Sequence, residues 1–215
     1  MKAFEKWETE EVERTFGISF LQESESMHQW LAYRQDLLPK ESERMEVLRK
    51  KIQLFANFWN EEDLKVFFIM PIIEIVDFYA PNKYRAFMVA TFQAELVDAN
   101  NEPCVLRGRV EMVVATGKQR PQTPFFFLNE YKPQIKAQSD PKGQVLSAML
   151  AAQAKNKGLN LPIYGLYTIG QNWFFLLLKG KEYAVSRQFD STDQDDLKQI
   201  INMLQFVKQR IEENI

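Results

Sequence analysis

The chain is short of the residues that build most metal and redox sites. Its 215 residues include one cysteine, Cys104, and one histidine, His28. A structural zinc site needs four Cys or His ligands and a disulfide needs two Cys, so one chain can form neither. We interpret Cys104 as a small half-buried side chain and His28 as a helix-surface residue. Any chemistry is therefore expected from carboxylates, Lys, Ser, Thr or Tyr, helped by a hard metal that prefers oxygen ligands.

Long apolar runs are also missing. The longest are the eight residues 66–73 and the six residues 173–178, whereas a membrane-spanning helix needs about 20. The first residues, MKAFEKWETEEVERTF, mix acidic and basic side chains and do not resemble a secretory signal. No GxxxxGK[ST] or GxGxxG loop occurs, so nucleotide-loop enzymes are not indicated. We expect a cytoplasmic protein without membrane association.

The apolar pattern predicts helices at both ends of the chain and a sheet between them. Residues 1–60 are rich in charge, with apolar side chains at helical spacing after Ser42. The segment 125–128 is apolar at every position, which is typical of a central strand covered on both faces. We predict helices over 42–59, 140–155 and 192–213, and strands over 85–97, 105–115, 125–131, 163–169 and 172–178.

No repeat, low-complexity tract or Gly/Ser linker divides the chain. We therefore expect a single domain over residues 1–215. Its parts are a helical amino-terminal part (1–60), a core (61–190) and a carboxy-terminal helix (191–215).

Charge is unevenly distributed along the chain. Residues 103–187 contain twelve Lys or Arg and four Asp or Glu, a net charge of +8. The preceding residues 1–102 have a net charge of −7, and residues 188–215 one of −3. A basic segment of this kind is typical of a polyanion-binding site. An ordinary solvated basic surface explains it equally well.

Two of the four acids in this basic segment, Glu111 and Glu130, lie inside apolar strands. An ionised carboxylate there needs a cation or a metal as a partner. Strand alternation places Glu130 and Lys132 on one face, and Glu111 in the preceding strand can reach the same point. Two carboxylates, a main-chain carbonyl and waters form a site that Mg²⁺ accepts, beside a Lys that can steady a phosphate. The alternative is a set of structural ion pairs, Glu130 with Lys132 and Glu111 with a nearby Arg.

The order of these motifs resembles the PD-(D/E)xK nuclease superfamily. The resemblance covers roughly Asn60 to Leu178, and it looks closest to the nuclease modules of type I restriction enzymes and related uncharacterised bacterial proteins. It rests on a strand with an internal acid, an apolar strand ending in E-x-K, a helix that begins with Gln, a strand pair, and an Asn-Glu helix before an apolar segment: RGRVEMVV, PFFFLNEYKP, DPKGQVLSAMLAAQ, GLYTIGQNWFFLLL and NEEDLKVFFIMPII.

The resemblance implies a fold and a set of roles. The fold is α/β, a restriction-endonuclease-like mixed central β-sheet flanked by helices, with a helical N-terminal extension and residues 61–190 as the nuclease-like core. Lys132 becomes the catalytic lysine that orients or deprotonates the attacking water, and Gln144 matches a helix Gln beside the site in some branches. The implied ligands of Mg²⁺ or Mn²⁺ are Glu111, Glu130, the carbonyl of Tyr131, and Glu61.

The implied activity is metal-dependent hydrolysis of nucleic-acid phosphodiester bonds. DNA is the expected substrate. Whether the protein forms a homodimer is left open by the resemblance. Basic side chains of the middle segment would hold the phosphate backbone, which makes binding sensitive to salt. These side chains are Lys118, Arg120, Lys136 and Lys142.

Two alternatives remain. In the superfamily the first acid is usually an Asp that follows a Pro, whereas Glu111 follows Val110 here. A nuclease-fold module that binds nucleic acid or a protein without cutting fits this departure. The other alternative is an interaction protein whose terminal helices pack against a partner or a second copy. Its sign would be an exposed apolar stripe on residues 4–16: Phe4, Trp7, Val12 and Phe16.

Overall fold

The long strands lie where the sequence pattern predicts them. The computed structural model describes residues 2–132 and 140–215. The five predicted strands correspond to β4 (Tyr84–Val97), β5 (Pro103–Thr116), β6 (Gln122–Lys132), β7 (Ile163–Ile169) and β8 (Asn172–Lys179). The shorter strands are β1 (Lys2–Ala3), β2 (Ser19–Phe20), β3 (Tyr79–Ala80), β9 (Glu182–Val185) and β10 (Phe189–Asp190).

Within the described residues these strands form one ten-stranded mixed sheet, in the order β2-β9-β8-β7-β6-β5-β4-β3, with β1 beside β5 and β10 beside β8. The strands β4, β5 and β6 are antiparallel neighbours, whereas β6 and β7 are parallel. The predicted central position of the apolar strand is confirmed, because Phe127 pairs with Val114 on one side and with Tyr164 on the other.

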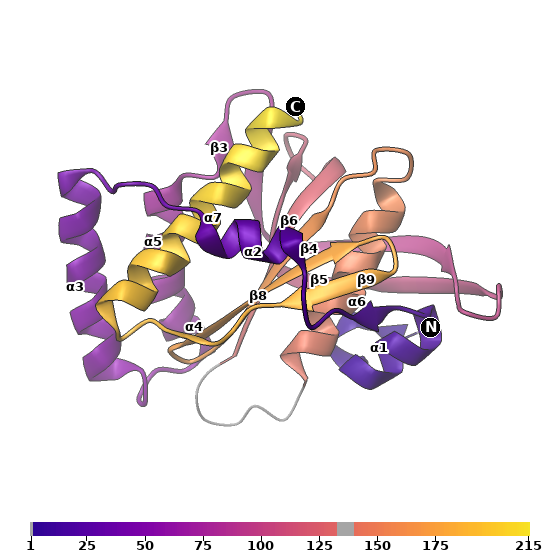
Figure 1. Ribbon diagram of the computed structural model, residues 1–215, viewed down its shortest axis with the longest axis horizontal. Helices are drawn as coiled ribbons and strands as arrows, with labels where there is room; N and C mark the ends of the chain where they lie inside the picture. The colour runs from indigo at the N-terminus through magenta and orange to yellow at the C-terminus, as the bar shows by residue number, and fades with distance from the viewer. Residues whose placement is uncertain (1, 133–139) are drawn as a thin grey trace.

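Helices cover both faces of the sheet (Figure 1). The connection between the parallel strands β6 and β7 contains α6, as a parallel pair requires. The helical elements are η1 (Phe4–Lys6), α1 (Thr9–Phe16), α2 (Glu25–Ala32), α3 (Pro39–Phe55), α4 (Glu61–Leu64), the π-helical turn η2 (Lys65–Ile69), α5 (Met70–Val76), α6 (Pro141–Lys155) and α7 (Gln194–Glu213). The expected α/β class is therefore confirmed.

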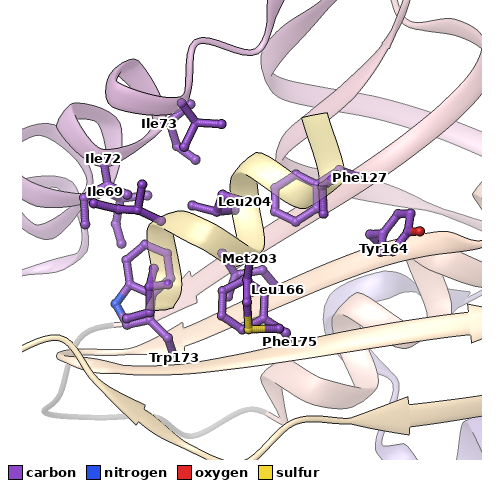
Figure 2. Close-up of a cluster of buried hydrophobic side chains, with 14 of the residues drawn as sticks. Ile69, Ile72, Ile73, Phe127, Tyr164, Leu166, Trp173, Phe175, Met203 and Leu204 are labelled. Atoms are coloured by element: carbon purple, nitrogen blue, oxygen red, sulfur yellow. The ribbon is translucent and has the colours of Figure 1, made fainter. Parts of the chain in front are cut away.

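Each face of the sheet has its own hydrophobic core. One core joins the sheet to α2, α3, α5 and α7, and the other joins it to η1, α1 and α6. Figure 2 shows the first, where residues of η2 and α5 and residues of α7 meet aromatic side chains of the sheet. Burying apolar surface on both faces explains why the middle of β6 and most of β7 are apolar.

The first 60 residues are not purely helical, which corrects the expectation of a helical extension. Their short strands β1 and β2 join the main sheet beside β5 and β9. The helix α3 begins at Pro39, three residues before the expected start at Ser42, and this first position suits proline because its missing N–H would be unpaired there. The helix ends at Phe55, before the expected Trp59.

The apolar stripe on residues 4–16 is buried. The side chains of the stripe, on η1 and α1, pack against α6 and β5. Phe4 lies so close to Gly108 that a Cβ there would be 2.6 Å from its ring, so this position of β5 needs glycine. The exposure that the interaction-protein alternative required is therefore not found at Phe4, Trp7, Val12 or Phe16.

Cys104 and His28 match their interpretation. Cys104 is half-buried on β5, and His28 is exposed on α2. Among the helices that the structure describes, none is both long enough and apolar enough to cross a bilayer.

Candidate active site

The pairing of β5 with β6 brings two buried acids next to each other. Met112 lies opposite Asn129; Glu111 precedes Met112 and Glu130 follows Asn129, so the two acids lie at the next position along the antiparallel pair. Both are buried, with exposed fractions of 8% and 2%. The two acids therefore occupy adjacent positions of neighbouring strands, and the charge of Glu111 contributes to raising the pKa of Glu130.

On its other side, Glu111 lies beside an irregularity in β4. The pairs Met88–Met112 and Ala90–Val110 enclose Val89 and Glu111, which do not pair themselves. Val89 has φ of 54°, a left-handed conformation that is rare for a β-branched residue. Breaks of this kind in a strand are common beside functional sites, where they redirect a side chain. No pattern of residues in the chain indicates this break.

Glu130 and Lys132 form an ion pair on the same face of β6. The Lys132 ammonium donates to Glu130 Oε1 at 2.8 Å, and it lies 3.8 Å from Glu61 Oε2. Burial raises the pKa of Glu130 to about 7; Lys132 opposes this rise, whereas Glu111 and Glu61 add to it. One lysine thus only partly offsets the cost of burying this carboxylate.

Lys132 itself is held as an ammonium ion. Burial lowers its pKa, but Glu130, Glu61 and Glu111 outweigh burial, and the pKa ends above its ordinary value. An amine with a raised pKa is protonated at neutral pH and cannot accept a proton there. A protonated Lys132 can donate to a water or to a phosphate oxygen, and it does not act as a base at neutral pH.

Glu111 has three partners, of which only a nearby Arg was expected from the sequence. Tyr131 donates its hydroxyl to Glu111 Oε2 at 2.9 Å, and Lys65 Nζ lies 3.4 Å from the same oxygen. Arg109 lies 3.4 Å from Oε1, in agreement with the alternative that a nearby Arg satisfies Glu111. Burial and Glu111 raise the pKa of Tyr131, so this phenol keeps its proton.

Two signals in the sequence point to these partners. Lys65 follows Glu61 by four residues, which puts both on one side of a helix. Arg109 and Glu111 are two apart in a strand and so share a face. The phenol of Tyr131 carried no such signal, because strand alternation directs it away from Glu130 and Lys132.

A short helical segment holds Glu61 and Lys65 over the strands. It begins at Asn60, whose side chain accepts from the Asp63 N–H at 2.9 Å and caps α4. Leu64 and Phe68 are buried and fix the segment to the core. The chain then passes through the π-helical turn η2 into α5, and such turns occur often at functional sites.

Other predicted site residues lie apart from this cluster. Gln144 is buried in the first turn of α6. Within the described part of the chain its Oε1 has no hydrogen-bond partner, and its side chain forms no hydrogen bond with Glu111 or Glu130. Lys118 and Arg120 lie in the loop between β5 and β6. This loop begins after Thr116, which lies about 17 Å from Glu111 along the strand because an antiparallel strand rises about 3.4 Å per residue.

Lys142 lines a hollow together with Glu8, Glu10 and Glu13, so its surroundings are acidic. Lys136 lies outside the described residues. A nucleic-acid contact of these four basic residues stays a prediction.

The donor set is compatible with a hard cation. Mg²⁺ commonly binds one or two carboxylates and completes its shell with water and substrate phosphate, and Glu111 and Glu130 offer this number. The raised pKa of Glu130 shows a carboxylate that further positive charge would stabilise. Among residues 2–132 and 140–215, no group of three or more His, Cys, Asp or Glu side chains is arranged to hold a metal by itself.

Fold and site together define an α/β protein with a buried carboxylate–lysine cluster. No protein-family model matches the chain, and no curated protein matches it in sequence. What the cluster does is therefore argued from its geometry.

Proposed function

We propose that this protein is a metal-dependent nuclease of the PD-(D/E)xK type. The observation that carries the proposal is the ion pair of Glu130 and Lys132, 2.8 Å apart, with Glu111 at the adjacent position of the neighbouring strand. The order of elements supports it: a strand with an acid, a strand ending in E-x-K, the helix α6, and a strand parallel to the second. This is the order on which the resemblance rests.

Each residue of the cluster has a role in this proposal. The carboxylates of Glu111 and Glu130 and the carbonyl of Tyr131 hold the metal, with Glu61 beside them. Bound there, Mg²⁺ supplies Lewis-acid stabilisation of the pentacoordinate phosphate. Lys132 places its ammonium where it orients the attacking water and offsets charge on the phosphate. Lys65 keeps Glu111 in position from the helical side.

The test is cleavage of labelled single- and double-stranded DNA and RNA in Mg²⁺ or Mn²⁺. We expect Glu130→Gln and Lys132→Ala each to lower the rate about 100-fold or more, since each removes a group that acts on the charged transition state. Matched controls are Glu74→Gln and Lys198→Ala, which change exposed residues elsewhere. Thermal unfolding verifies that all four variants fold. Cutting that survives both site substitutions, or survives chelator, refutes the proposal.

A second candidate is a module with this fold that binds nucleic acid without cutting. It is favoured by the partners of Glu111, because Lys65, Arg109 and the Tyr131 hydroxyl already satisfy this acid. Such a module would bind oligonucleotides equally well with and without chelator and would cut none of them.

A further inference from the structure

A groove of about 1240 Å³ lies at the carboxyl end of β5, which continues for five residues from Glu111 to Thr116. Its walls are the β3–β4 turn and the β5–β6 loop, and Tyr79 and Ile215 also line it. Figure 1 shows the carboxy terminus near β3 at this end of the molecule. The groove is thus separate from the carboxylate–lysine cluster.

The charged side chains that line the groove are all cations. They are Lys83 and Arg85 from the first wall and Lys118 and Arg120 from the second. None of the four side chains has an ion pair or a hydrogen bond with any residue in the described ranges 2–132 and 140–215. The nearest acid on the neighbouring helix, Glu212, accepts a hydrogen bond from the lining residue Tyr84 at 2.8 Å.

One cation is already fixed in place. The guanidinium of Arg85 lies over the Phe87 ring at 4.1 Å, and its Nε is buried without a hydrogen-bond partner in the described part of the chain. The terminal N–H groups of this half-buried guanidinium also have no partner in the described part of the chain, and arginine binds phosphate oxygens through paired N–H groups.

Both walls are also fixed by backbone geometry. Asn82 has φ of 61° in a turn closed by the bond from Lys83 N to Ala80 O at 3.0 Å, and Asn is one of the few residues that accept this conformation. Gly117 has φ of 104°, and a Cβ there would lie 2.3 Å from the Arg120 carbonyl oxygen. The loop that carries Lys118 and Arg120 therefore needs glycine, and the backbone positions of the cations are set before any ligand arrives.

We propose that this groove binds the phosphate backbone of a nucleic acid. Four unpaired cations without a lining carboxylate side chain form a potential that attracts a chain of phosphates. The choice of nucleic acid among polyanions rests on the proposed function. The groove would hold a part of the strand about 17 Å from the acids along β5, so it acts in holding the strand and not in cutting it.

The test measures binding in chelator, where no metal-dependent cutting takes place. Lys83→Gln, Lys118→Gln and Arg120→Gln are combined in one variant, because all three residues are exposed and their loss leaves the core intact. The matched control removes three exposed lysines outside the groove, Lys6→Gln, Lys40→Gln and Lys198→Gln. Fluorescence anisotropy with labelled 20-nucleotide single-stranded DNA and RNA gives the affinity at several salt concentrations.

We expect the groove variant to lose about tenfold or more in affinity at low salt, and the slope of log K against log salt to decrease by about 2 for single strands. The control variant should bind within about twofold of the natural protein. Equal weakening in both variants, no binding by the natural protein, or equally tight binding of polyglutamate would overturn the proposal. Cleavage is measured separately, so failure of the groove and failure of the nuclease proposal are told apart.

Discussion

At the scale of single residues, Glu130 is the most costly side chain of the site. It is 2% exposed, and within residues 2–132 and 140–215 the cation that forms an ion pair with it is Lys132. Burial therefore raises its pKa to about 7. A carboxylate in this position lowers the stability of the protein in its ionised form, which is the usual sign of a residue kept for function.

This gives a prediction for Glu130→Gln. The pKa of Glu130 is higher in the folded chain, so between pH 4.5 and 7 the folded state binds more protons than the unfolded one and the natural protein loses stability as pH rises. Gln does not titrate. The free energy of unfolding of the variant, relative to the natural protein, should therefore increase by on the order of 2 kcal/mol from pH 4.5 to pH 8.

Urea unfolding at a series of pH values measures this difference. The slope with pH is the readout, because replacing the protonated acid by an amide adds an offset that does not depend on pH, whereas the ion pair with Lys132 is already part of the shifted pKa. Glu74→Gln, at an exposed acid, should show no such slope. A difference between Glu130→Gln and the natural protein that stays constant over the range would contradict the raised pKa.

At the scale of elements, the start of α6 joins two parts of the fold. Asp140 caps this helix by accepting from the Gly143 N–H at 3.0 Å. It also accepts from the N–H and hydroxyl of Thr9 at the start of α1, at 2.7 and 2.6 Å. Gly143 lacks a Cβ that would lie 2.5 Å from the Trp7 carbonyl oxygen, so the segment before α1 packs directly on the helix.

Asp140→Ala should therefore destabilise the protein by about 1–2 kcal/mol at pH 7, the usual range for losing a helix cap. Burial raises the pKa of Asp140, but the hydrogen bonds from Thr9 and Gly143 outweigh it and hold the pKa below its ordinary value. The contribution of Asp140 is thus present above about pH 4 and is lost as the acid takes a proton.

Denaturant unfolding measures the destabilisation by Asp140→Ala at pH 7, and the same experiment at pH 3 shows how far it decreases as Asp140 takes a proton. Asp36→Ala is the control, because Asp36 is exposed and its ion pair with Lys198 is long, at 3.9 Å. If Asp140→Ala destabilised the protein no more than Asp36→Ala does, the cap would carry no stability.

At the scale of the whole molecule, one sheet joins the two cores. The strands that bury Phe127 and Phe175 on one face bury Phe125 and Leu176 on the other. Neither core can lose its packing without exposing the strands that support the other. The chain should therefore unfold in a single cooperative transition.

Substitution of Trp30 tests this expectation, because Trp30 lies on α2 and packs on strands and a helix more than 130 residues later in the chain. It is fully buried, donates to the Met203 carbonyl at 2.7 Å, and packs on Tyr164 and Phe175 at centroid distances of 4.9 and 5.3 Å. Trp30→Ala should cost about 3–5 kcal/mol, and Trp30→Phe less.

Calorimetry together with circular dichroism and tryptophan fluorescence follows the transition. Trp7 reports on the second core, so its signal should shift with the rest in both variants. Phe58→Ala is the control, since Phe58 is 82% exposed. Two separate transitions would mean that the cores are independent, contrary to the single domain expected from the sequence.

Local sequence patterns were sufficient for the long elements and for part of the site. Alternation and helical spacing predicted β4 to β8, α6 and α7, because these patterns follow from which side of a backbone meets water. The same alternation placed Glu130 and Lys132 on one face. The short strands β1 and β2 had no such signal, since two residues are too few to form a pattern and their place depends on β5 and β9.

The sequence by itself determined the α/β class, the central apolar strand and the spacing of Glu130 with Lys132, because all of these depend on neighbours in the chain. Only the tertiary structure decided that Lys65 and the Tyr131 hydroxyl reach Glu111, that Lys118 and Arg120 lie with Lys83 and Arg85, and that residues 4–16 are buried. The physical reason is that these contacts depend on strand register and on helix packing. Both are set by the burial of surfaces that lie far apart in the sequence.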